Sequence, residues 1–405
     1  MHPSLEKVPD FSAALGIPVY VVGGAVRDAL LDRPVADIDI ASALHPPEFK
    51  LRCRHHGWHT IDTGIDHGTV TVLVDGVAYE HTTFRLDVSC DGRNATIRFS
   101  DTIEEDLSRR DFTINAMAWR PGEFVDPFGG RDDLMERRIL RCVGDPSLRF
   151  AEDKLRIVRA ARFAARFSLL VSPDLAPAAR TLAPSYAAHV SPERSAAETL
   201  KARMHGPEYI RLCRDFGVLG NLVPAAADLD DEDFETWIDL LSRASVNSEE
   251  AWVAALAWAR PGPSPQIAAE ALADHLRLST RLKRAASQVL QLSPQLNAAS
   301  EAPASLRRLI EAAGPNWPLV RDYALEVLPS SAALRQRLFE YEAAALAALA
   351  SPIVNGATLS RLGLKPSPLF KELISWAGDR QAEGMPRDEL LQHLEIEIQN
   401  RSVHD

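Results

Sequence analysis

The sequence of 405 residues has no long hydrophobic run and no secretion pattern, and these absences exclude several classes of protein. No apolar stretch approaches the ~20 residues that a membrane span needs, so the sequence predicts no transmembrane segment and no membrane partner. Its first residues, MHPSLEKVPDFSAAL, lack the basic and then apolar order of a signal peptide. With 46% hydrophobic and 25% charged residues, the composition is typical of a soluble globular protein.

Cysteine and histidine are present without the spacing that metal sites or disulfide scaffolds need. The four cysteines (Cys53, Cys90, Cys142 and Cys213) include no C-x-x-C pair. The 12 histidines show neither H-E-x-x-H nor H-x-x-x-D. The sequence therefore argues against zinc and against a disulfide framework, and it predicts a protein of the reducing cytoplasm.

The chain also lacks the overall positive charge that nucleic-acid binders usually carry, because its formal net charge is −11. The charge is unevenly distributed, however. Residues 137–170 contain nine Lys or Arg against three Asp or Glu, whereas residues 228–239 are strongly acidic. A local basic surface can bind phosphates whatever the total charge, so nucleic-acid binding stays open.

The stretch YVVGGAVRDALLDRPVADIDIA, residues 20–41, contains the first motif that points to chemistry. A short apolar strand leads into Gly23 and Gly24, and an amphipathic helix follows. Glycine lets the backbone approach a ligand closely, and a helix N-terminus attracts anions. Arg27 adds a full positive charge. Alone, a Gly-Gly pair before a helix is usually an ordinary turn, but in this context the motif predicts a phosphate-binding site.

The strand that follows carries Asp37 and Asp39. Side chains alternate along a strand, so both carboxylates face one way while Ile38 and Ile40 face a core. A lone D-x-D is usually a solvated strand edge. Two carboxylates within about 20 residues of a phosphate site, in the strand–turn–helix–strand context, instead predict Mg²⁺ and a nucleoside triphosphate.

Alternating stretches at residues 69–74 and 77–83, joined by Asp75-Gly76, predict a hairpin within a mixed or antiparallel sheet. Glu80 lies in the second stretch, which should pair with the strand of the D-x-D. Glu80 is either a third metal-site carboxylate or a salt-bridge partner of Arg85 or Arg27, and the residues leave both open.

Residues 103–119, IEEDLSRRDFTINAMAW, predict a helix beside an anion site. Arg110 could meet a phosphate. Asp111 and Asn115, four residues apart, would share a helix face and could read ribose hydroxyls. Taken alone, R-R-D is usually a solvated charge cluster.

Residues 150–167, FAEDKLRIVRAARFAARF, predict one helix with charges every third residue, at Asp153, Arg156, Arg159 and Arg162. An exposed arginine-rich helix is a common alternative. Facing a groove, the same residues would suit base edges and phosphates, because Asp and Arg offer complementary acceptors and donors.

From Ser191 onward the pattern is helical, with Pro192 at a helix start. Residues 82–99 predict a hairpin with its turn at Asp91-Gly92-Arg93. Near the end, Lys365 and Lys371 flank a helix start that could grip nucleic-acid backbone or could be an ordinary capped helix.

These motifs occur in a familiar order: VVGGAVRDALL, DIDIA, TGIDHGTVTV, EHTTFR, EEDLSRRDFTINAMA, DPFGGRDDL and EDKLRIVRAARFAARF. In this the chain resembles the class II tRNA nucleotidyltransferases, the bacterial CCA-adding enzymes of the polymerase-β-like superfamily. The resemblance is strong over residues 19–205. The C-terminal LGLKPSPLFKELISWAGDRQAEGMPRDELL is similar to the family's tRNA-binding tail.

The resemblance implies a role for each matching residue. Asp37 and Asp39 match the metal-binding pair, and Gly24 and Arg27 match triphosphate contacts. The remaining matches are a phosphate-contacting arginine, two ribose-reading residues, a pair that recognises the incoming C or A, and two further nucleotide-contacting arginines: Arg110; Asp111 and Asn115; Asp153 and Arg156; Arg159 and Arg162.

The resemblance further implies an α+β fold. A polymerase-β-like head with a small mixed or antiparallel sheet (1–140) would precede an elongated all-α neck with the nucleotide-selecting helix (141–205), a body (206–328) and a tRNA-binding tail (329–405).

The implied activity is template-independent, Mg²⁺-dependent addition of C, C and A to the tRNA 3′ end from CTP and ATP by two-metal catalysis, with pyrophosphate released. No obligate protein partner is inferred. A CC-adding, A-adding or poly(A)-forming relative remains the alternative.

Overall fold

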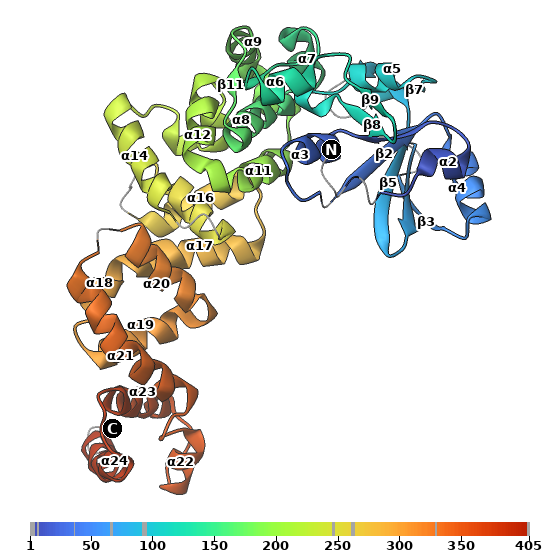
Figure 1. Cartoon of the computed structure of the whole chain (residues 1–405). Helices are drawn as coiled ribbons and strands as arrows, with labels where there is room; N and C mark the ends of the chain where they lie inside the picture. The colour runs from blue at the N-terminus through green and yellow to red at the C-terminus, as the bar shows by residue number, and fades with distance from the viewer. Residues whose placement is uncertain are drawn as a thin grey trace. The chain divides into compact units, whose positions relative to one another are not determined.

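The computed structural model describes residues 5, 8–35, 37–64, 68–90, 95–244, 248–260, 264–328 and 330–402. The chain divides into two compact units, Met1–Leu222 and Val223–Asp405 (Figure 1). Within the described ranges, no helix is both long and apolar enough to cross a membrane. The predicted division into four parts, at residues 140, 205 and 328, stays a prediction.

The first unit contains a seven-stranded sheet in the order β3-β4-β5-β2-β1-β8-β9. In the described part of this sheet, β2 and β5 are parallel and the other neighbours are antiparallel, so the predicted mixed sheet is confirmed. The strands are β1 Val19–Val22, β2 Ile38–Ser42, β3 His59–Gly64, β4 Thr69–Val74, β5 Val77–Thr83, β8 Ala118–Arg120 and β9 Glu123–Val125.

Two smaller pairings accompany the sheet. β6 (Arg85–Cys90) and β7 (Ala95–Phe99) form the predicted antiparallel hairpin, and its expected turn at residues 91–93 lies outside the described residues. β10 (Ile139–Leu140) and β11 (Leu170–Val171) pair in parallel.

The burial of alternate residues explains how the sheet is oriented. In β4, Val70, Val72 and Val74 are buried, as the period-2 pattern predicts. On this face Phe49 of α4 stacks on His81 of β5, with ring centroids 3.7 Å apart. The other face carries a core that includes Tyr20 and Leu107, so α5 covers part of it.

Helices α2 to α6 of the first unit are interspersed with the strands, and from α7 onward this unit is almost entirely helical. They are α2 Phe11–Leu15, α3 Gly24–Leu30, α4 Pro46–His55, α5 Ile103–Ser108, α6 Gly130–Met135, α7 Pro146–Glu152, α8 Leu155–Phe167, α9 Leu175–Leu182, α10 Tyr186–His189, α11 Pro192–Lys201, α12 Gly206–Asp215 and α13 Leu219–Leu222, with 3-10 turns at Thr113–Asn115, Ala183–Ser185 and Arg203–His205.

Two predicted helices were wrong in extent. The helix expected over residues 103–119 ends at Ser108, so Asp111 and Asn115 do not share an α-helical face. The helix expected over residues 150–167 is two helices, because Asp153 adopts an extended backbone between α7 and α8. The Oδ1 of Asp153 accepts a hydrogen bond from the backbone N–H of Leu155, which favours a new helix start there.

Every described element of the second unit is helical. These elements are α14 Asp231–Arg243, α15 Glu249–Ala257, α16 Pro265–His275, α17 Thr280–Leu292, α18 Leu296–Ala299, α19 Pro303–Ala313, α20 Trp317–Glu326, α21 Ala332–Ala350, α22 Gly356–Arg361, α23 Pro368–Ala382 and α24 Arg387–Ser402, with 3-10 turns at Pro224–Ala226, Ser293–Gln295 and Gly314–Asn316. Inside this unit, Asp379 of α23 accepts hydrogen bonds from Arg307 and Arg308 of α19 and so links the two helices.

Candidate functional site

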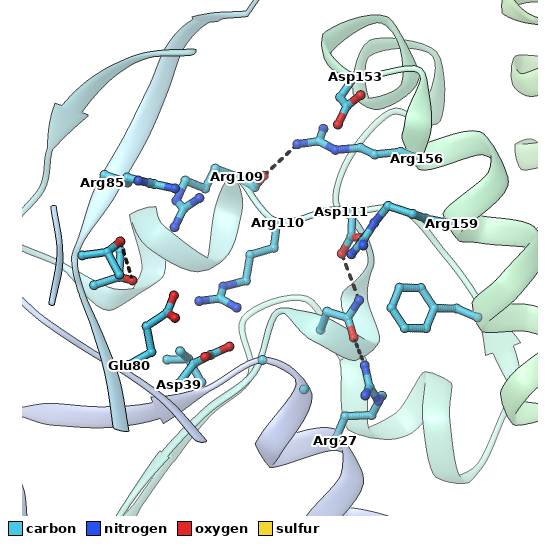
Figure 2. Close-up of a pocket in the computed structure, with 17 residues that line it drawn as sticks. Arg27, Asp39, Glu80, Arg85, Arg109, Arg110, Asp111, Asp153, Arg156 and Arg159 are labelled. Atoms are coloured by element: carbon cyan, nitrogen blue, oxygen red, sulfur yellow. Dashed lines mark hydrogen bonds and ion pairs between the residues drawn. The ribbon is translucent and has the colours of Figure 1, made fainter. Parts of the chain in front are cut away.

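A polar pocket of about 510 Å³ lies in the first unit, where the sheet meets the segment after α5 and the start of α8 (Figure 2). The pocket combines carboxylates, arginines, glycines and hydroxyls from these three sources. Its lining residues are Val22, Gly23, Gly24, Arg27, Asp39, Thr69, Glu80, Thr82, Arg85, Arg109, Arg110, Asp111, Asn115, Asp153, Arg156, Arg159 and Phe163.

Two carboxylates from neighbouring strands lie together in this pocket. Asp39 and Glu80 are register partners in the parallel β2–β5 pair, so both project from the same face of the sheet. The pKa of Asp39 is raised, first by the protein atoms that displace water from it and then by the negative charge of Glu80. The positive charge of Arg110 opposes this rise, and Asp37 adds to it.

Asp37 lies one residue before β2, and its side chain is exposed. It is not among the residues that line the pocket, although it is close enough to influence the Asp39 carboxyl. Ile38 and Ile40 are buried, as the alternation predicts. Glu80 lines the same pocket as Arg27 and Arg85, so both interpretations of its role stay predictions.

The glycine pair brings backbone and an arginine into close approach. Gly23 has φ = +68°, a conformation that L side chains rarely adopt. A Cβ on Gly23 would lie 2.5 Å from Nη1 of Arg110, whereas a Cβ on Gly24 would lie 3.5 Å from Nη2 of Arg27. The absence of a side chain at residue 23 therefore makes room for the Arg110 guanidinium above the turn.

Asp106 fixes the two arginines that follow α5. Its carboxylate accepts hydrogen bonds from Arg109 at 2.9 Å and from Arg110 at 3.1 Å, and it is almost fully buried. Burial alone would raise the pKa of Asp106, but the charges of Arg110 and Arg109 lower it below its usual value. Sequence reasoning missed this residue, although its spacing of three and four residues from the arginines is the helical spacing of an ion pair.

Asp111 and Asn115 come together without an α-helix. Nδ2 of Asn115 donates to Oδ1 of Asp111 at 2.9 Å, and Nη1 of Arg27 donates to Oδ1 of Asn115 at 2.5 Å. Burial would raise the pKa of Asp111, but Arg159 and the Asn115 hydrogen bond lower it. The Arg27 guanidinium also lies 5.3 Å from the ring centroid of Phe163. These contacts hold Arg27 at the pocket wall.

The part of the pocket lining beyond the sheet and the segment after α5 includes residues of the α7–α8 junction. Oδ2 of Asp153 accepts a hydrogen bond from Arg194 at 2.7 Å, and Arg156 donates to the carbonyl oxygen of Arg109 at 3.4 Å. Arg159 donates to Oδ2 of Asp111 at 2.6 Å from Nη2. Asp153, Arg156 and Arg159 therefore line the pocket, with Asp111 tying α8 to the opposite segment.

Arg162 lies outside this pocket. It is 6% exposed and donates to Glu198 of α11, which is also buried and lies within 3.5 Å of Nη1 of Arg159. The three-residue spacing turns each successive arginine by about 60° around the helix, so Arg162 faces α11 rather than the groove.

Figure 2 shows the two ends of the pocket, with Asp39 and Glu80 on one side, Asp153 and Arg156 on the other, and Arg110 between them. Strand β2, which carries Asp39, and helix α8, which carries Arg156 and Arg159, thus converge on one pocket. Sequence reasoning did not place six lining residues here, namely Val22, Thr69, Thr82, Arg85, Arg109 and Phe163. For Thr82, the period of two from Glu80 along β5 could have indicated it.

Comparison with known proteins identifies a family model that matches the part of the chain containing most of this pocket. Residues 19–140 match the model of the poly A polymerase head domain. This range includes the glycine turn, the carboxylates of Asp39 and Glu80, and the segment that carries Arg110.

Curated relatives match the chain over its N-terminal half. The CCA-adding enzyme of Streptococcus gordonii is 49% identical over 185 residues, which are 45% of this chain and 44% of the relative. The CCA-adding enzyme of Geobacillus thermodenitrificans is 41% identical over 235 residues, 54% of this chain and 56% of the relative. The matches thus span about half the length of these relatives.

Solved structures extend the similarity to the whole chain. The CCA-adding enzyme of Bacillus stearothermophilus, in complex with CTP, superposes with a TM-score of 0.68 at 28% identity, covering 98% of this chain and 100% of that one. The predicted fold class, a polymerase-β-like head followed by a helical region, is therefore confirmed.

Proposed function

We propose that this chain, which carries a poly A polymerase head domain and has the fold of CCA-adding enzymes, adds C, C and A to the 3′ end of tRNA from CTP and ATP. The observation that supports this most directly is the single pocket that joins the Asp39–Glu80 pair to Asp153 and Arg156. One bound nucleotide can then present its phosphates to one end and its base to the other.

The phosphate end is built from positive charge over a glycine turn. Arg110 lies directly above Gly23, is held by Asp106, and has a buried Nε without a hydrogen-bond partner among the described residues. This donor suits a phosphate oxygen. Arg27 and Gly24 lie beside it, and we assign these residues to the triphosphate and to the departing pyrophosphate.

The acidic end fits a divalent cation, for which we propose Mg²⁺. Burial first, and then the negative charge of Glu80, raise the pKa of Asp39, and a cation between the two carboxylates would favour the charged form of both. Asp37 would join them as the second carboxylate of the D-x-D. When bound, one or two such ions lower the pKa of the attacking 3′-hydroxyl and neutralise charge on the α-phosphate.

The base end selects the nucleotide. Asp153 offers a carboxylate acceptor and Arg156 offers fixed donors, so a base with the matching edge forms hydrogen bonds that others leave unpaired. Asp111 and Asn115 suit ribose hydroxyls. Arg159 braces Asp111 and contributes positive charge, while Arg162 acts through Glu198 and not through the nucleotide.

We assign the tRNA body to the helical second unit, with recognition by shape and backbone charge, as duplex RNA favours. We also place the enzyme in the cytoplasm. The described cysteines Cys53, Cys142 and Cys213 are free and buried, which suits a reducing compartment.

The test is extension of a tRNA transcript that lacks its last three nucleotides. With CTP alone the account predicts two added nucleotides, and with CTP and ATP it predicts three, ending in A. UTP and GTP should give no product.

Other products would replace this proposal by its alternatives. Arrest after two cytidines in the presence of ATP indicates a CC-adding enzyme, and extension only of tRNA that already ends in CC indicates an A-adding one. A long adenosine tail, which the match to the poly A polymerase head domain makes a specific alternative, indicates a poly(A) polymerase.

A further inference from the structure

Two threonine hydroxyls line the pocket beyond the carboxylates and have no part in the functions assigned above. Thr69 of β4 and Thr82 of β5 are register partners, and their Oγ1 atoms lie 3.5 Å apart. Both side chains are partly exposed. Thr82 follows Glu80 by two residues, so it projects from the same face of β5.

Strand register places this pair opposite the phosphate end. In β1–β2, Val21 is opposite Ile40 and Tyr20 is opposite Ala41, so β1 runs past Asp39 toward Gly23. In β2–β5, Thr82 is the partner of Ala41, on the other side of Asp39. Along the strands the order is therefore Gly23, then the Asp39–Glu80 pair, then Thr82.

That order matters for an in-line displacement. The attacking hydroxyl and the departing pyrophosphate lie on opposite sides of the α-phosphate. With pyrophosphate at Gly23 and Arg110, the hydroxyl of the RNA 3′ end approaches from the side of Thr69 and Thr82.

From this geometry we infer that Thr69 and Thr82 bind the ribose of the last RNA nucleotide through its 2′-hydroxyl. This inference rests on the proposed function and deepens it. Two hydroxyls that share one hydrogen bond retain one O–H donor and free lone pairs, which match a 2′-hydroxyl that both donates and accepts. The 2′-hydroxyl is also the group by which a protein distinguishes RNA from DNA. The threonine pair therefore makes the enzyme selective for a ribose at the acceptor end.

The sheet offers a matched control for this pair. Thr63 and Thr71 form a second cross-strand hydroxyl pair, 3.1 Å apart, on the neighbouring strands β3 and β4. Thr71 is two residues from Thr69 and shares its face, but it is not among the residues that line the pocket. Thr71→Val removes the same atoms from the same face of the sheet, at a position that pairs with Glu80 but does not line the pocket.

The experiment measures KM for tRNA and for CTP in Thr69→Val, Thr82→Val, the double variant, Thr82→Ser and Thr71→Val. The acceptor is a tRNA lacking its last three nucleotides, ending either in a ribonucleotide or in a 2′-deoxynucleotide that keeps its 3′-hydroxyl. For the ribose end, the double variant should raise the tRNA KM about tenfold and leave the CTP KM unchanged, since each lost hydrogen bond weakens binding several-fold. Thr82→Ser and Thr71→Val should behave as wild type.

The deoxy-terminated acceptor separates the inference from a general loss of fit. Wild type should bind this end about as weakly as the double variant binds either end. Equal weakening of both ends, an equal rise in the CTP KM, or the same loss in Thr71→Val would overturn the inference and leave the proposed function intact. A wild-type protein that extends neither acceptor would overturn the proposed function, and this inference with it.

Discussion

At the scale of single residues, the close contact between Gly23 and the Arg110 guanidinium restricts residue 23 to glycine. The pocket needs the Arg110 guanidinium over the turn, and a Cβ at residue 23 would lie 2.5 Å from it. Gly23→Ala should therefore lose most nucleotide binding as well as about 1–3 kcal/mol of stability from its strained backbone, with φ = +68° and ψ = −124°. The measurements are the CTP Kd and the free energy of unfolding.

Gly122→Ala is the control for Gly23→Ala. Gly122 has φ = +83° in the β8–β9 turn, and a Cβ there would meet nothing within 4 Å. It should show a similar loss of stability with an unchanged CTP Kd. Equal effects on CTP binding in both variants would contradict the role given to the Gly23–Arg110 contact.

Glu80 is the residue whose role the sequence left open. Its position opposite Asp39 in β2–β5 favours the metal-site interpretation. Glu80→Gln should lower kcat on the order of 100-fold, because several kcal/mol of transition-state charge stabilisation depend on the carboxylate pair. The CTP Kd should change little. A kcat equal to that of wild type would contradict the metal-site role and indicate that Glu80 is an ordinary polar residue of the sheet.

At the scale of elements, His81 makes β5 sensitive to pH. It is fully buried against Phe49, its Nε2 lies 2.8 Å from Oγ of Ser42, and burial lowers its pKa to about 3. The unfolded chain takes up this proton near pH 6.5, whereas the folded protein takes it up only near pH 3. Stability therefore falls as the pH decreases from about 6.5 toward 3.

Lowering the pH from 7 to 5 should decrease the free energy of unfolding by about 2 kcal/mol through His81 alone. Urea unfolding of wild type and His81→Gln at both values checks it. The variant is less stable at pH 7 but should lose about 2 kcal/mol less than wild type on acidification. Parallel losses in the two proteins would contradict a neutral buried His81.

The elements also show what the sequence could predict and where it failed. β4 and β5 have the predicted bounds, because alternating burial and the Asp75-Gly76 turn are local features. The prediction of one helix over residues 150–167 was wrong at Asp153. Asp153 has an extended backbone, but the helical spacing of the charged residues continues on both sides of it and hides the break. Asp111 and Asn115 still touch, because a 3-10 turn at Thr113–Asn115 brings them together where an α-helix was predicted.

The part of the site that the sequence could not give depends on long-range pairing. Residue types and motif order indicated Asp39, Arg110, Asp153 and Arg156. The pairing of the Glu80 strand with the strand of the D-x-D was predicted, but the exact register that sets Asp39 against Glu80 depends on strands far apart in the chain. The direction of Arg162 was missed because its partner, Glu198, lies on a different helix.

At the scale of the whole molecule, the two units should respond separately to damage. Asp379 is 8% exposed and neutralises Arg307, itself 3% exposed, inside the second unit. Asp379→Ala removes the buried carboxylate that pairs with Arg307 and Arg308 and leaves Arg307 only the largely exposed Glu311 as an acidic partner among the described residues, so the second unit should lose about 3 kcal/mol of stability. Nucleotide binding in the first unit should stay unchanged, as calorimetry with and without CTP would show.

Asp239→Ala is the matched control, because its ion pair with Arg243 lies on the surface of the same unit. It should cost less than about 1 kcal/mol. A loss of CTP affinity in Asp379→Ala, or equal destabilisation by both variants, would contradict the separation of the units.

The central claim is that one nucleotide is held with its phosphates at the acidic strand and its base at the α7–α8 junction. The most direct measurement compares Asp39→Asn with Asp153→Ala, scoring incorporation of all four nucleotides into tRNA and the Kd of CTP. The account predicts that Asp39→Asn stops all incorporation but still binds CTP, whereas Asp153→Ala still transfers nucleotides but also accepts UTP and GTP. An Asp153→Ala protein that keeps wild-type choice, or an Asp39→Asn protein that keeps wild-type rates, would contradict it.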